Sequence, residues 1–214
     1  MSQKEPRTFQ LVSKELERWG VLLVSDSKLS SVAGLITHAP LRGSWWAHPQ
    51  SHEIFRIASR LASRPDVLAP RLVGGKVTFL HKKLWPALFA IGAAREPWQL
   101  EGLSERAQKL LGRVERVGAL RTDELAAETG ERAKSLGQAA RELERRLLVY
   151  GEQFHTESGA HAKRLESWQH LAQRLRFKRR RMPAPAAKKK LEKIAAALEA
   201  RFRSKVRLPW KAAF

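Results

Sequence analysis

The stretch that decides the fold reads LSERAQKLLGRVERVGALRTDELAAETG at residues 103–130 and continues as ERAKSLGQAARELERRLLVY at residues 131–150. Apolar residues recur at helical spacing until Gly118, with the inward positions Leu103, Ala107, Leu110, Leu111, Val114 and Val117. A short second helix is predicted from Thr122, a favourable N-cap, to Gly130, which suits a left-handed C-cap. The stretch therefore begins with two helices separated by a turn.

A third helix, predicted over residues 131–146, has one apolar and one basic face. The apolar residues are Leu136, Ala139, Ala140 and Leu143, at the spacing that places them on one side of a helix. The outward residues are polar or basic, and we assign five of them to contacts with DNA: Arg132, Lys134, Ser135, Gln138 and Arg141.

The pattern then changes from helical to β-strand spacing. Residues 147–150 and 160–165 are predicted as two strands, joined through a tip that contains Glu157, Ser158 and Gly159. Helix, short helix, basic helix and hairpin is the order of a winged helix-turn-helix, in which the third helix enters the major groove and the hairpin lies along the backbone. On this interpretation the phosphate contacts of the hairpin are His161, Lys163 and Arg164.

Composition sets wider limits. The chain has 214 residues, 43% of them hydrophobic, which is enough for one large or two small domains with real cores. Its formal charge of +20 predicts binding to a polyanion at low salt whatever the fold, so charge supports nucleic acid without proving it. The absence of cysteine excludes disulfides, thiolate catalysis and cysteine-ligated metals. No apolar run approaches the roughly 20 residues needed to span a bilayer. We expect a cytoplasmic, nucleoid-associated protein that does not contact membranes.

The N-terminal part repeats the order of elements without repeating the residues. Helices are predicted over residues 8–19, from Ser27 or Ser30 to about Thr37, and from Pro49 to Leu61. The third of these has the apolar stripe Ile54, Phe55, Ile57, Ala58 and Leu61. Two β-rich runs, 67–73 and 76–80, follow across Gly74 and Gly75, a strong hairpin signal because both turn positions accept positive φ.

These patterns predict a mainly α protein with small β-hairpins (α+β), built as a tandem winged helix-turn-helix. A first unit with a connecting helix is expected over residues 1–100 and a second winged helix over 101–173. The connecting helix, residues 84–94, is mainly apolar and is expected to be buried between the two units. A basic C-terminal arm is expected over 174–214.

The C-terminal part contains fifteen lysines or arginines between residues 174 and 211, against only Glu192 and Glu199. A Pro/Ala hinge at 182–187 and a helix at about 189–203 are predicted, with Leu191, Ile194, Leu198 and Phe202 on the docking edge. We favour a phosphate-tracking arm over a merely solubilising one. Its assigned contacts are Arg176, Lys178, Arg179, Arg180, Arg181, Lys188, Lys189 and Lys190.

Motifs for catalysis are weak. The sequence has no Walker-type phosphate loop and no nucleophile elbow, and we expect no metal and no cofactor. His48 and His52 stand four apart beside Glu53, but a cap-region and a surface histidine explain them better than a zinc site. The three aspartates, Asp26, Asp66 and Asp123, each lie at a turn or helix start, where structure alone accounts for them.

Two adjacent tryptophans, Trp45 and Trp46, occupy a loop of small residues. They are candidates for stacking on exposed bases or for wedging open a duplex step. The interpretation that we favour places one ring in the core and the other over a neighbouring helix.

The residues Arg42-Gly43-Ser44 before a helix, the hairpin at 67–80 and the closing unit at 103–168 together resemble a family. It is the winged-helix superfamily that includes the bacterial interstrand-crosslink DNA glycosylases, which are built of tandem winged helices. The resemblance spans most of residues 8–168 and implies a tandem winged-helix DNA-binding protein. Those glycosylases share a Gln-x-Gln or Gln-x-Asp motif, and no glutamine in this chain has Gln or Asp two residues after it. No catalytic residue is therefore carried over.

Two functions from different classes follow. The first is a non-enzymatic protein, regulatory or associated with DNA repair, that binds double-stranded DNA through a winged helix and a basic arm. The alternative is a DNA glycosylase with a diverged site, in which Glu53 or Asp26 would activate water beside the Trp45-Trp46 loop.

Overall fold

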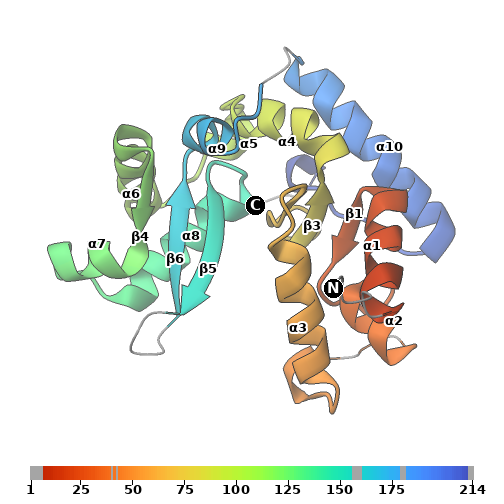
Figure 1. Ribbon diagram of the computed structural model, residues 1–214. Coiled ribbons are helices and arrows are strands. Elements are labelled where there is room, and N and C mark those ends of the chain that lie inside the picture. The colour runs from red at the N-terminus through yellow and green to blue at the C-terminus, as the bar shows by residue number, and fades with distance from the viewer. Residues whose placement is uncertain (1–6, 40, 42, 156–160, 179–181, 212–214) are drawn as a thin grey trace. The chain divides into compact units, whose positions relative to one another are not determined.

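The structure is a computed structural model, which describes residues 7–39, 41, 43–155, 161–178 and 182–211 (Figure 1). This part of the chain is mainly helical and contains two three-stranded antiparallel sheets, so the predicted α+β class is confirmed. The chain divides into two compact units. The first ends at Trp85 and also includes Lys189–Leu208, and the second runs from Pro86 to Lys188 and includes the chain from Pro209 onward.

The first unit consists of helices around one small sheet, whose strand order is β1-β3-β2. Its elements are α1 (Arg7–Trp19), β1 (Val21–Leu23), α2 (Val32–Thr37), the 3-10 helix η1 (Trp45–Ala47), α3 (Ser51–Ala62), β2 (Val67–Leu68), β3 (Thr78–His81), the 3-10 helix η2 (Lys82–Leu84) and most of α10 (Ala184–Phe202).

The core of the first unit forms where the predicted apolar stripes of α1 and α3 meet. Val12 and Leu16 of α1 and Ile54, Ile57 and Leu61 of α3 are all buried in one cluster. The buried residues of α1 and of α3 recur at helical spacing, so each helix turns one apolar stripe to this core.

Three details of the predicted first unit are wrong. The helix α3 begins at Ser51, so Pro49 precedes it, and Phe55 of the predicted stripe is 44% exposed. The cap of α2 is Ser31, whose hydroxyl accepts a hydrogen bond from the Gly34 amide, and not Ser27 or Ser30.

The glycine pair makes the predicted turn. Gly74 and Gly75 both have positive φ, and the Lys76 amide donates to the Val73 carbonyl at 3.0 Å. The strand before this turn is shorter than the predicted 67–73, because Pro70 has no amide hydrogen with which to continue a ladder. The turn and the end of the strand therefore both follow from local chemistry, and the predicted strand was too long because it continued through Pro70.

The second unit has the sheet order β4-β6-β5 and packs α6 against α8. Its elements are α4 (Trp85–Gly92), α5 (Pro97–Leu100), α6 (Glu105–Val117), β4 (Ala119–Arg121), α7 (Thr122–Thr129), α8 (Ala133–Arg145), β5 (Tyr150–His155), β6 (His161–Glu166), α9 (Trp168–Arg174) and the 3-10 helix η3 (Pro209–Lys211).

The predicted hairpin is shifted along the chain. Its first strand begins at Tyr150, because the chain turns at Leu147, which has a φ of 52° and is fully buried together with Leu148. An apolar run cannot by itself distinguish a buried turn from a strand. The second strand is confirmed from His161, and the tip with Glu157, Ser158 and Gly159 lies outside the described residues.

Two further corrections concern the start of this unit. Val117 was predicted to face inward and is 57% exposed, because α6 has already reached its last turn there. The N-cap of α7 is Arg121, and Thr122 is its first residue. The Thr122 hydroxyl instead accepts a hydrogen bond from the Lys163 amide at 3.0 Å, which ties α7 to β6.

The second unit begins earlier than residue 101. The Phe89 ring of α4 lies 5.4 Å from that of Trp168 in an edge-on arrangement and 4.8 Å from that of Phe177 in a stacked one. These aromatic contacts join α4 to the C-terminal end of the same unit and explain why the boundary falls at Pro86.

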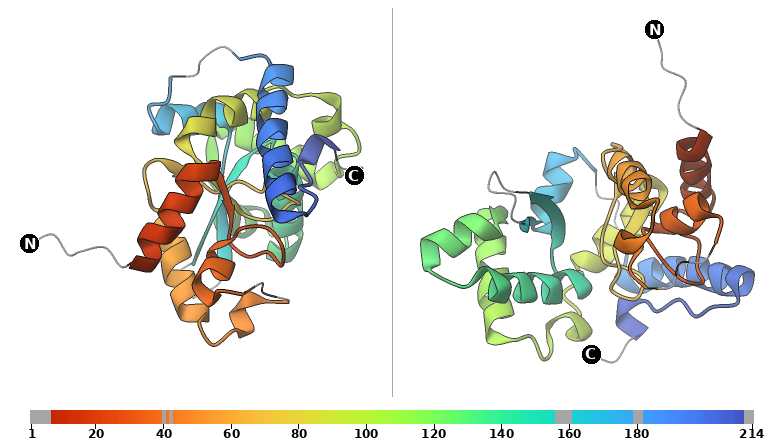
Figure 2. Two further views of the ribbon diagram at one scale, coloured as in Figure 1. Left: turned by 90° about the vertical axis from the view of Figure 1, so that its right-hand side faces the viewer. Right: turned by 90° about the horizontal axis from the view of Figure 1, so that it is seen from below.

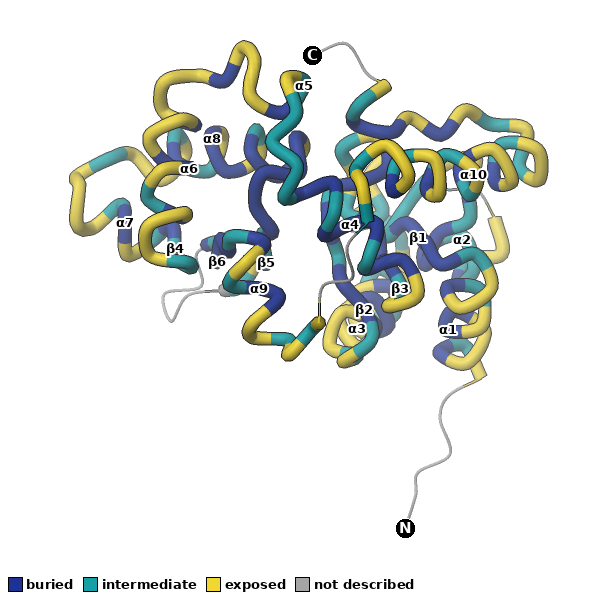
Figure 3. The backbone as a smooth tube through the Cα atoms, turned by 90° about the horizontal axis from the view of Figure 1, so that it is seen from above, coloured by how far each residue is buried: buried dark blue, intermediate teal, exposed yellow. Residues whose placement is uncertain are grey.

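The C-terminal helix α10 differs from the predicted arm. It begins at Ala184, so the expected Pro/Ala hinge forms its first turn, where proline is tolerated. From Lys189 onward it belongs to the first unit and lies beside α1 (Figures 1 and 2), where the Phe202 and Trp19 rings are 6.1 Å apart. Leu191 and Leu198 of the predicted edge are buried, and the alternation of buried and exposed residues along α10 is visible in Figure 3.

In the described residues, no helix combines the length and the apolar character that crossing a membrane would require.

Two glycines in helices of the second unit provide a matched test of this fold. A Cβ at Gly92 would collide with the Trp168 ring, whereas a Cβ at Gly112 would meet nothing within 4 Å. We expect Gly92→Ala to lower the free energy of unfolding by about 1–3 kcal/mol through overpacking. Gly112→Ala should raise it by about 0.5–1 kcal/mol through helix propensity. Urea denaturation of both variants measures this, and equal effects would contradict the described contact of α4 with Trp168.

Candidate nucleic-acid interface

The burial of α8 confirms its two predicted faces. Leu136, Ala139, Ala140 and Leu143 are buried in the core of the second unit. The opposite face carries an exposed row, which consists of Lys134, Gln138, Arg141 and Arg145. The members of this α8 row are separated by three or four residues, so they follow one another along the same side of the helix.

The cations of α8 have no carboxylate partner in the described part of the chain. This holds for the three in the α8 row, Lys134, Arg141 and Arg145, and for Arg132 just before the helix. Because nothing neutralises these charges locally, they remain able to pair with an external anion.

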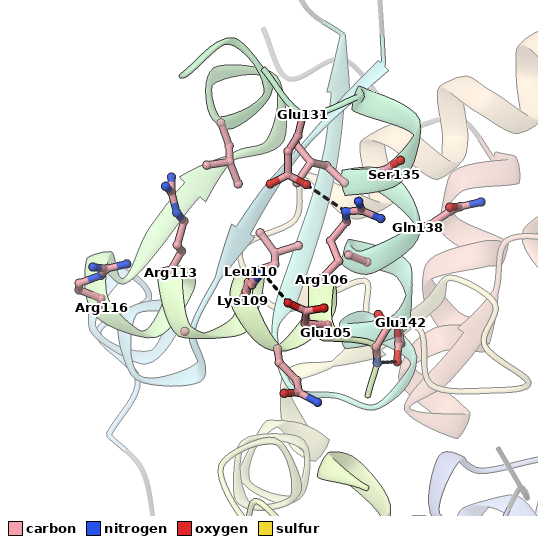
Figure 4. A pocket seen from close by; sticks show the side chains of 16 residues that line it. Glu105, Arg106, Lys109, Leu110, Arg113, Arg116, Glu131, Ser135, Gln138 and Glu142 are labelled. Carbon is pink, nitrogen blue, oxygen red and sulfur yellow. Dashed lines mark hydrogen bonds and ion pairs between the residues drawn. The ribbon is translucent and has the colours of Figure 1, made fainter. Parts of the chain in front are cut away.

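The neighbouring helix α6 behaves differently. Three of its cations are paired with carboxylates: Arg106 with Glu131 at 3.0 Å, Lys109 with Glu105 at 2.6 Å, and Arg113 with Glu128 at 3.1 Å. A groove of about 1010 Å³ lies between α6 and α8, and the first two of these pairs are visible in it (Figure 4). The groove is therefore of mixed charge, and the α8 row is the more electropositive feature of this unit.

A carboxylate on α8 fixes the helix against the start of α6. Glu142 accepts hydrogen bonds from the Ser104 amide at 3.0 Å and from the Ser104 hydroxyl at 2.7 Å. Since Ser104 also caps α6 through the Ala107 amide, these bonds hold both helices in register. Two sets of contacts therefore position the helix that carries the α8 row. They are the packing of its apolar face and the hydrogen bonds of Glu142 near its C-terminal end.

The structure gives Lys163 a different role from the predicted phosphate contact. Its ammonium forms an ion pair with Glu144 of α8, and the two side chains are only 12% and 7% exposed. Gly151 of β5 provides the space, because a Cβ there would collide with the Glu144 carboxylate. Lys163 therefore joins α8 to the sheet, and its charge is not presented to solvent.

Arg164, the next residue on β6, points to the other face of the sheet, as neighbouring residues of a strand do. Its guanidinium lies 2.8 Å from the carboxylate of Glu166, which is 1% exposed and also binds Arg174 at 3.0 Å. This arrangement compensates a buried carboxylate with two arginines. The side chain of His161 lies outside the described residues, so its predicted phosphate contact stays a prediction.

The predicted phosphate contacts of the basic C-terminal arm fall into three groups: paired, exposed, and outside the described residues. Lys188 pairs with Glu96 at 2.8 Å, and Lys190 donates to the Lys83 carbonyl at 3.4 Å. Lys189, Arg176 and Lys178 are exposed. Arg179, Arg180 and Arg181 lie outside the described residues.

The two tryptophans of η1 come close to the favoured interpretation, except that Trp45 is half-buried at the edge of the core and not within it. Trp45 packs against the core of the first unit, and Trp46 lies outside it at 61% exposure. Their rings stack with centroids 3.9 Å apart, and the Trp46 ring is 5.7 Å from that of Phe55 on α3.

The carboxylates considered for catalysis have structural partners. Asp26 accepts hydrogen bonds from the amides of Lys28 and Leu29, each at 2.9 Å, and from the Lys76 ammonium at 2.8 Å. Burial raises the pKa of Asp26, but these hydrogen bonds outweigh it and leave that pKa below its usual value. Glu53 lies 3.7 Å from the Arg56 guanidinium on the same helix.

The histidine pair is no metal site in the described residues, where no three His, Asp or Glu side chains gather as ligands. The ring of His48 accepts a hydrogen bond from the Gln50 amide at 3.1 Å, in the turn before α3. It therefore acts in the cap region, as predicted.

Comparisons with protein-family models, with curated proteins and with solved structures gave no match for this chain.

The ion pair of Lys163 and Glu144 leads to a stability prediction. Lys163→Ala leaves a buried carboxylate without its cation, and we expect it to lower the free energy of unfolding by about 3–5 kcal/mol. The double variant Lys163→Met/Glu144→Gln should recover most of that loss, because no uncompensated charge remains. Chemical denaturation compares the two, and a single variant as stable as the original protein would show that the pair contributes little.

Proposed function

We propose that this protein binds double-stranded DNA, with the α8 row in the major groove. The observation that carries the proposal is a helix packed on the core whose exposed row contains one glutamine and three cations, and these cations have no carboxylate partner among the described residues. Between Lys134 and Arg145 the helix rises by roughly 16 Å, at 1.5 Å per residue. An α-helix with its side chains is about 10–12 Å in diameter, so it fits in the major groove, which is about 12 Å wide.

The order of elements supports the proposal. Both units contain, in chain order, a helix, a strand, two helices and two strands. In each unit the last of these strands, β3 or β6, lies in the middle of the sheet. This order of elements supports the winged helix-turn-helix that the sequence predicts, in which the third helix would read DNA. We therefore propose a tandem winged-helix protein, in which α3 and α8 are the corresponding helices.

The chemistry of the row suggests a division of labour. Gln138 and Arg141 are the residues able to read base edges, since glutamine pairs with adenine and arginine with guanine in the major groove. Lys134 and Arg145, toward the two ends of the helix, suit phosphates. Exposed cations of the tail, such as Lys178 and Lys189, would add contacts that depend on phosphate alone. A protein with this role acts at the nucleoid.

Two substitutions test the α8 row. Arg141→Ala should weaken binding to a duplex that contains the preferred sequence by about 1–3 kcal/mol and reduce discrimination between duplexes. Arg145→Ala should weaken binding to all duplexes alike and lower the slope of log affinity against log salt by about 0.9. The measurement is fluorescence anisotropy of labelled duplexes, selected from a random pool, at several salt concentrations.

The matched control is Lys14→Ala. Lys14 is an exposed lysine of α1, so its loss removes one positive charge from a helix that the proposal keeps off the DNA. Affinity should change little in this variant. If Arg141→Ala and Lys14→Ala reduce affinity equally, charge alone drives binding and the proposed face is wrong.

A further inference from the structure

A short ladder of three aromatic rings projects from the first unit at the start of α3. Trp45 is its inner ring, packed against the core, and Trp46 stacks on it at 3.9 Å with an interplanar angle of 25°. Phe55 flanks Trp46 at 5.7 Å and is itself 44% exposed. The ladder therefore begins in the core and ends in solvent.

The outer ring has an open face. Trp45 covers one face of the Trp46 indole and Phe55 lies beside it, yet 61% of Trp46 remains exposed. An indole supported in this way is a flat, apolar platform whose orientation is already fixed, and exposed apolar surface of this kind marks binding sites. Because the ring is already oriented, less conformational entropy is lost when a ligand stacks on it.

The helix that carries Phe55 also exposes basic side chains, which favour an anionic ligand in this part of the first unit. Arg56 follows Phe55 on α3, and its side chain is 55% exposed and 3.7 Å from Glu53. His52 is exposed on the same helix, one turn before Arg56. A ligand that has a flat ring and belongs to a polyanion is attracted by these exposed cations and offers a face to the indole.

We propose that Trp46 stacks on an unpaired nucleobase of DNA, while exposed basic side chains of α3 such as Arg56 attract the phosphate backbone. In an intact duplex both faces of each base are covered by its neighbours, so only an unstacked base offers a free face. Base stacking on an aromatic side chain tolerates any base, because every base has a π-face. The inference extends the proposed function, on which it rests, to DNA that has a single-stranded or unstacked position.

The experiment uses the full chain and three DNA probes, of which the two single strands have the same length and charge. They are an oligothymidylate single strand, a single strand of the same length with abasic residues, and a blunt duplex. Binding is followed by fluorescence anisotropy for the original protein, Trp46→Ala and Trp46→Phe. Because Trp46 is mostly exposed, the variants should keep the original melting temperature, which circular dichroism checks.

Trp46→Ala should weaken binding to oligothymidylate by about 5- to 100-fold, which corresponds to the loss of stacking on one base. Trp46→Phe should lose less, because a ring remains. Neither variant should change the affinity for the abasic strand, which offers no base to the indole. Any change on the blunt duplex should be smaller than on oligothymidylate, because only its two terminal base pairs have a free face.

Two results would overturn the inference. One is an unchanged affinity of Trp46→Ala for oligothymidylate, or an equal loss on the abasic strand, since either shows that the indole does not stack on a base. The other is a dimer of the original protein in sedimentation that Trp46→Ala dissociates, which would make a second copy the occupant of the platform. Failure of the duplex proposal looks different: Arg141→Ala would bind duplex normally, while Trp46→Ala would still lose affinity for oligothymidylate and not for the abasic strand.

Discussion

Burial of one apolar face of α8 is the constraint on which the second unit depends. One face of α8 lies in the same core as α6 and the sheet, through Leu136, Ala139, Ala140 and Leu143. The residues on the opposite side of the helix then point away from that core. The α8 row must therefore face solvent as long as that core is formed. The proposed DNA interface is thus a consequence of packing, because the buried residues of α8 determine where its exposed residues point.

The basic side chains of the second unit separate into two groups with different roles. Lys163 and Arg164 compensate the buried carboxylates Glu144 and Glu166, so they contribute to the structure of the sheet. Lys134 and Arg141 have no such partner in the described residues and remain exposed. Net charge alone does not distinguish these groups. A chain as basic as this one uses part of its positive charge internally, and only the remainder is able to attract a polyanion.

Local rules predicted the helices well and long-range contacts poorly. The faces of α8, the left-handed Gly130 and the Gly74-Gly75 turn follow from helical periodicity and from glycine's access to positive φ. The turn at Leu147 was missed because a leucine rarely adopts that conformation, and only the surrounding core makes it favourable. The partner of Lys163 was missed because Glu144 lies nineteen residues away and the pairing depends on strand register. Gly151 was the one signal in the sequence, as a strand glycine often marks a close approach.

The most direct test of the central claim is an amide NMR titration of the full chain with a short duplex. The account predicts that chemical shifts change first and most along Lys134, Gln138, Arg141 and Arg145, with little change on the paired face of α6. Shift changes confined to α10 and the rest of the basic tail, with the α8 row unaffected, would contradict it.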